Sequence, residues 1–85
     1  MNHQSIQSLK DMFGFEEKGM FLDRVVTTKD GIKATVSIAV VDGFIGIYIE
    51  DWNAPYATIF EMSIKSGENS DEMLPSIVSA IILNL

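Results

Sequence analysis

Apolar and polar residues alternate along residues 32–64, and this alternation predicts antiparallel β-strands. Asp42 and Gly43 lie between two such runs, and they suit a two-residue type I′ turn, because both central positions of that turn need positive φ. The turn places Val41 opposite Phe44. On one face of the hairpin it then forms three apolar pairs, which are Val40–Ile45, Ile38–Ile47 and Val36–Ile49.

The other face of this hairpin receives a mixed set of side chains. The same register pairs Ala39 with Gly46, Ser37 with Tyr48 and Thr35 with Glu50. A slip of one residue would exchange the two faces, so burial of the apolar face specifies the register well.

A further strand on each side extends the predicted sheet. A four-residue turn at 52–55 would place Ile49 opposite Thr58, Ile47 opposite Phe60 and Ile45 opposite Met62. Upstream, a two-residue loop at Asp30 and Gly31 would pair Val25 with Val36 and Phe21 with Val40. That pairing directs Asp23 into the core, where an unpaired acid is costly, so we expect a bulge near Asp23 or a strand that ends there.

Helical spacing marks both ends of the chain. Ile6, Leu9, Met12 and Phe13 follow it near the start, and Gly14 stands where a left-handed C-terminal cap is expected. Near the end, one apolar stripe is formed by Leu74, Ile77, Val78, Ile81, Ile82 and Leu85. Pro75 requires this helix to begin near Asp71 or Glu72, so that the proline lies in the first turn. The β-branched residues of this segment would also allow a strand, but the stripe favours a helix.

The pattern as a whole predicts an α+β fold. A four-stranded antiparallel meander sheet is combined with an N-terminal and a C-terminal helix, in the order α-β-β-β-β-α, with the helices mainly on one sheet face. We expect residues 1–85 to form a single small globular domain with one thin core. The segment 65–71, rich in Ser, Gly and Asn, is the expected mobile loop.

Composition and charge narrow the functional classes. The chain has no Cys and no secretory signal pattern after Met1, so we expect a cytoplasmic protein. Its net charge of −6 and its six scattered Lys and Arg residues argue against direct binding to nucleic acid or to anionic membranes. The longest apolar run is also shorter than the roughly 20 residues that span a bilayer.

No residue pattern indicates catalysis, a metal site or a cofactor. The one imidazole, His3, lies near the start of the chain, where we expect a solvated tail. Glu50 and Glu61 are the best candidates for a carboxylate pair, but they fall on adjacent strands without opposing each other, on a face expected to be wet. Asp51 and Asn53 resemble the start of a calcium loop, which Pro55 interrupts.

The outward face of the hairpins carries more apolar surface than a solvated face needs. We predict a partner-binding patch there, rimmed by Glu50 and Glu61 and joined by Trp52 from the adjacent turn. The apolar members of this patch are Val41, Phe44, Tyr48 and Ile59. They surround two small residues, Ala39 and Gly46, which form its floor. Two alternatives are that the N-terminal helix covers this face, or that a homodimer buries it.

The sequence thus favours a non-catalytic, acidic protein-binding module that acts as an inhibitor or accessory factor. The negative charge would steer it to a basic protein surface. One version is a small phage or mobile-element protein that blocks a basic nucleic-acid-binding partner. The alternative is a homo-oligomeric structural protein that uses the same patch for self-association.

Overall fold

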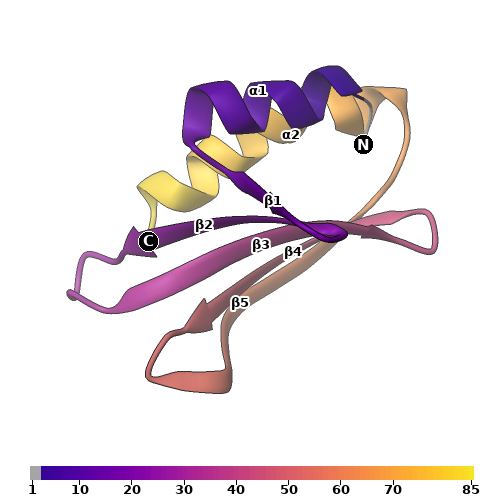
Figure 1. Ribbon diagram of the computed structural model, residues 1–85. Coiled ribbons are helices and arrows are strands. Elements are labelled where there is room, and N and C mark those ends of the chain that lie inside the picture. The colour runs from indigo at the N-terminus through magenta and orange to yellow at the C-terminus, as the bar shows by residue number, and fades with distance from the viewer. Residues whose placement is uncertain (1–2) are drawn as a thin grey trace.

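The computed structural model describes residues 3–85, apart from the side chains of residues 55 and 56. Its order is α-β-β-β-β-β-α (Figure 1). The helices are α1 (His3–Phe13) and α2 (Glu68–Leu83), and the strands are β1 (Glu16–Lys18), β2 (Phe21–Thr27), β3 (Lys33–Val41), β4 (Phe44–Asp51) and β5 (Ala54–Lys65).

The α+β class and the antiparallel sheet flanked by helices are confirmed, but the predicted number of strands is wrong. The sheet has five strands in the order β1-β2-β3-β4-β5. The additional strand is β1, whose three residues pair with the start of β2. Its sequence, Glu-Glu-Lys, has no apolar alternation, so the pattern gave no sign of it.

The register of the β3–β4 hairpin is confirmed at every predicted pair from Val41–Phe44 to Thr35–Glu50. Asp42 and Gly43 have φ of 52° and 79°, which are the positive values that a type I′ turn requires. The residues of this one turn therefore predicted the strand register at the centre of the sheet correctly.

The predicted register between β2 and β3 is wrong by one residue. Val25 opposes Thr35, and Phe21 opposes Ala39. The connecting loop holds three residues, Lys29 to Gly31, because the Thr28 N–H donates to the Ile32 carbonyl at 2.9 Å. Gly31, with φ of 82°, closes this longer loop. The shift turns Asp23 away from the core, so β2 needs no bulge or early end at that residue.

The predicted register between β4 and β5 is wrong by two residues. Trp52 and Asn53 form a two-residue connection between β4 and β5, and the strand pairing is irregular at Glu50 and Asp51, just before this connection. A shift of two keeps the same side chains on each face. It pairs Ile45, Ile47 and Ile49 with Ile64, Met62 and Phe60, so Ile49 gains an apolar partner in place of the predicted Thr58.

The N-terminal helix is confirmed with its cap. α1 ends at Phe13, Gly14 follows with φ of 69°, and the Phe15 N–H donates to the Leu9 carbonyl at 3.2 Å. His3 is exposed, as expected, but it is the first residue of α1 and not part of an irregular tail.

The C-terminal helix is also confirmed, but it begins earlier than predicted. α2 begins at Glu68, so Pro75 lies inside the helix, and much of the segment expected to be a mobile loop is helical. Proline has no N–H to donate to the carbonyl four residues earlier, which belongs to Asp71. The buried Ser5 hydroxyl of α1 donates to that carbonyl at 2.8 Å. A hydrogen bond between the helices therefore replaces the one that proline removes.

Both helices contribute to one buried cluster with the sheet. Leu9 of α1 and Leu74 of α2 are fully buried together with the strand residues Val36, Ile38, Ile45, Ile47 and Ile49. We call the sheet face that carries these strand residues the inner face, and the opposite one the outer face. Figure 1 shows α1 and α2 drawn on the same side of the sheet.

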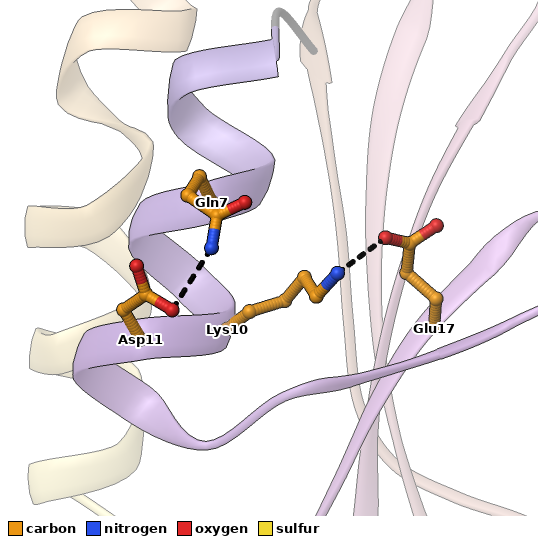
Figure 2. A network of polar contacts seen from close by, with 4 residues as sticks. All are labelled: Gln7, Lys10, Asp11 and Glu17. Atoms are coloured by element: carbon orange, nitrogen blue, oxygen red, sulfur yellow. Dashed lines mark hydrogen bonds and ion pairs between the residues drawn. The ribbon is translucent and has the colours of Figure 1, made fainter.

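One ion pair fastens β1 to α1. Lys10 Nζ lies 2.8 Å from Glu17 Oε1, and Gln7 Nε2 donates to Asp11 Oδ1 at 2.9 Å on the same helix (Figure 2). The hydrogen bond to Lys10 and the charge of that ammonium lower the pKa of Glu17, and the same contact raises the pKa of Lys10. Both side chains are largely in water, so the contact positions β1 and contributes little stability.

Candidate functional site

The outer face exposes several large apolar side chains. Phe44 is 49% exposed, Val41 45% and Ile59 43%, although an ordinary monomer buries most side chains of this size. Val41 and Phe44 are opposite each other beside the β3–β4 turn, as predicted. Ile59 lies between the β5 residues that pair with Ile49 and Glu50, and it has no partner of its own in β4.

The Tyr48 ring covers part of the predicted floor of small residues. A Cβ atom built on Gly46 would lie only 2.7 Å from ring atoms Cε2 and Cζ of Tyr48. The ring therefore lies flat over Gly46, and Ala39 on the neighbouring strand is fully buried. A partner's side chain above Gly46 would therefore contact the Tyr48 ring.

A shallow depression remains beside the Tyr48 ring. It measures about 410 Å³, and its lining residues are Val41, Asp42, Phe44, Gly46, Tyr48 and Ser63. Three of the seven residues predicted for partner binding, Val41, Phe44 and Tyr48, thus meet at one place. A concave apolar surface with an aromatic wall suits one protruding side chain of a partner.

Trp52 folds back over the outer face. Its indole Nε1 donates to Thr35 Oγ1 at 2.7 Å, and Lys33 Nζ lies 4.1 Å from the ring centroid. These contacts fix the indole while 51% of the residue stays exposed. A large ring held in place in this way loses little conformational freedom when a partner covers it.

A second depression, of about 370 Å³, lies between Trp52 and β1. Its lining includes Glu16 and Asp23, which are directly opposite each other on neighbouring strands. Like charges in opposed positions repel. Asp23 Oδ1 is shielded from solvent and accepts no hydrogen bond from any residue that the structure describes. Lys18 and Arg24 also line this depression, so cations of the chain itself lie near the two acids.

Glu50 and Glu61 flank Tyr48, although the predicted register had placed Ile59 and not Glu61 opposite that ring. Glu61 is directly opposite the ring on β5, and Glu50 lies two residues along β4 and opposes Thr58. Both are exposed, and they do not face each other. The outer face also carries lysines, at positions 18, 33 and 65, so the negative charge of the chain is not concentrated there.

Sequence reasoning missed the part of the outer face that β2 contributes. Val25 is 45% exposed and Phe21 38%, and both were assigned to the core by the shifted register. Gly31 could have indicated the correct register, because a glycine with positive φ suits the third position of a three-residue loop. That loop places Val25 and Asp23 outward, beside Thr35 and Trp52.

The described residues form neither a membrane-spanning helix nor a metal-ion cluster. Among residues 3–85 as described, no helix is long and apolar enough to cross a bilayer, and no three His, Asp or Glu side chains lie close enough to hold a metal ion. Comparison with family models, with curated proteins and with solved structures finds no match to this chain.

Proposed function

We propose that this protein is a non-catalytic binding module that docks the outer face of its sheet on a basic surface of another protein, as an inhibitor or accessory factor. The observation that carries the proposal is the row of half-exposed apolar side chains at Phe44, Val41 and Trp52 on one open face. The proposal takes the helices to cover the other face, which the shared buried cluster supports.

A basic partner is favoured by the two carboxylates beside the Tyr48 ring and by the net charge of the whole chain, and not by an excess of acids over the entire outer face, which also carries lysines. Glu50 and Glu61 flank Tyr48, and an Arg or Lys placed between them would contact both the ring and the acids. The net charge of −6 would raise the rate of association with a basic surface. A basic nucleic-acid-binding groove is one surface of this kind, and the lack of Cys fits action in the cytoplasm.

Capture from a lysate of the native host tests this function. Tagged protein would be used at low and at high salt, with mass spectrometry of the eluate. We expect a stoichiometric basic partner whose binding weakens at high salt. Recovery of no partner by the wild-type protein, or only of its own copies through the outer face, would overturn the proposal in favour of a self-associating structural protein.

Substitution of the Phe44 ring tests whether the partner binds at the outer face. Phe44→Ser should leave the fold intact, because the residue is half-exposed, and should weaken the partner's affinity at least tenfold, as loss of a central aromatic contact does. Leu83→Ser is the matched control, since Leu83 is 73% exposed but lies on α2. Equal binding by both variants would place the contact elsewhere.

A further inference from the structure

The free edge of β5 has backbone groups ready for another strand. β5 is the last strand of the sheet, and within the described residues only β4 pairs with it. The Ser66 N–H donates to the Gly43 carbonyl at 2.8 Å, which marks Phe44 and Lys65 as a pair without mutual hydrogen bonds. Because such pairs alternate, the backbone groups of Glu61, Ser63 and Lys65 point away from β4.

The side chains of this edge select a second copy of the same chain. In an antiparallel pair of two β5 edges with Ser63 opposite Ser63, Glu61 of each copy lies opposite Lys65 of the other. Both ion pairs form at once, and Met62 meets Ile64 on the inner face. A register with Glu61 opposite Glu61 would instead oppose like charges. Charge complementarity therefore favours one register and one symmetric partner.

The inner face at this edge is only partly covered. Phe60 is 37% exposed, and Met62 and Ile64 are partly buried against the core. Between β5 and α2 a depression of about 320 Å³ is lined by Phe60, Ala80, Ile81, Asn84 and Leu85. In the register described above, a second sheet joined at β5 would cover Met62 and Ile64 with its own Ile64 and Met62, and its Ser66 would lie opposite Phe60.

We propose that two copies join through the β5 edge, from Glu61 to Lys65, into one continuous ten-stranded sheet. In such an antiparallel junction, the opposed Ser63 side chains lie on the same face, so both outer faces lie on one side. The junction engages Glu61 and Lys65 at the margin of each outer face, and it leaves the depression beside Val41, Phe44 and Tyr48 uncovered on both copies. This inference does not depend on the function proposed for the outer face.

Ser63→Pro tests the edge without disturbing the sheet, because the Ser63 N–H is not used by β4 and proline is tolerated on edge strands. Ser63→Ala, which keeps the N–H, is the matched control. By light scattering over a range of concentrations, we expect the wild type and Ser63→Ala to reach twice the chain mass of 9.4 kDa and Ser63→Pro to remain monomeric. A wild type that stays monomeric would overturn the proposal, and so would a Ser63→Pro variant that dimerises like the wild type.

A charge exchange tests the register. Lys65→Glu should weaken dimerisation at least tenfold, and the double variant Glu61→Lys/Lys65→Glu should restore it. Dimerisation that Phe44→Ser abolishes and Lys65→Glu leaves unchanged would assign self-association to the outer face. Partner capture by Lys65→Glu, at concentrations where this variant is monomeric, would show that the proposed function holds whether or not the edge dimerises, because Lys65 does not line the depression beside Tyr48.

Discussion

The Asp71 carbonyl depends on a side chain from the other end of the chain. Pro75 removes its helical donor, and the buried Ser5 hydroxyl donates to it at 2.8 Å. Ser5→Ala should therefore lower the free energy of unfolding by about 1–3 kcal/mol, measured by urea denaturation. In a Pro75→Ala background the residue 75 N–H can donate to the same carbonyl, so the cost of Ser5→Ala should fall there. Equal costs in both backgrounds would show that the two donors do not substitute for each other.

Gly46 and Tyr48 form a second pair that must be considered together. Gly46→Ala would press a methyl group into the Tyr48 ring and should destabilise the fold by about 1–3 kcal/mol. In a Tyr48→Ala background the same substitution should be neutral or slightly stabilising, since glycine weakens a strand interior. Thermal unfolding of the four proteins measures the difference. If Gly46→Ala costs the same without the ring, another contact explains the cost.

At the scale of elements, Lys10 and Glu17 hold β1 against α1 through a contact that pH can break. The pKa of Glu17 is lowered, so its contribution to stability is present above pH 4.5 and is lost as pH falls through the lower folded value. The pKa of Lys10 is raised, so its contribution is present below pH 10.5 and is lost as pH rises through the higher folded value. In an NMR titration, Lys10→Met should raise the Glu17 pKa toward 4.5. An unchanged value would mean that the ion pair does not form in solution.

The elements that sequence predicted well are those fixed by local signals. Asp42 and Gly43 determine the β3–β4 register by their own φ preferences, and Gly14 ends α1 in the same way. The β2–β3 register failed because two- and three-residue loops both use a glycine, and a change of one residue exchanges the faces. The predicted start of α2 was wrong for a different reason. Pro75 is tolerated inside the helix beside a hydroxyl from Ser5, and that contact joins residues far apart in the sequence.

The same distinction applies to the candidate site. Val41, Phe44 and Tyr48 could be placed together because one reliable turn sets their positions. Two features required the three-dimensional arrangement of side chains. One is the Tyr48 ring over Gly46, which depends on a rotamer and not on register. The other is the opposed pair of Asp23 and Glu16, which depends on the short strand β1.

At the scale of the whole molecule, joining two sheets through β5 links stability to protein concentration. A species that binds only the native state stabilises it by mass action, and above the dissociation constant a tenfold rise in concentration contributes about 1.4 kcal/mol per dimer. With typical unfolding entropies for chains of this size, the midpoint of thermal unfolding should rise by about 4 °C per tenfold increase. Ser63→Pro should abolish this dependence, whereas Phe44→Ser should keep it, because Phe44 lies on β4 and not on the β5 edge that forms the junction. Calorimetry across a hundredfold range measures both, and a midpoint independent of concentration in the wild type would contradict the dimer.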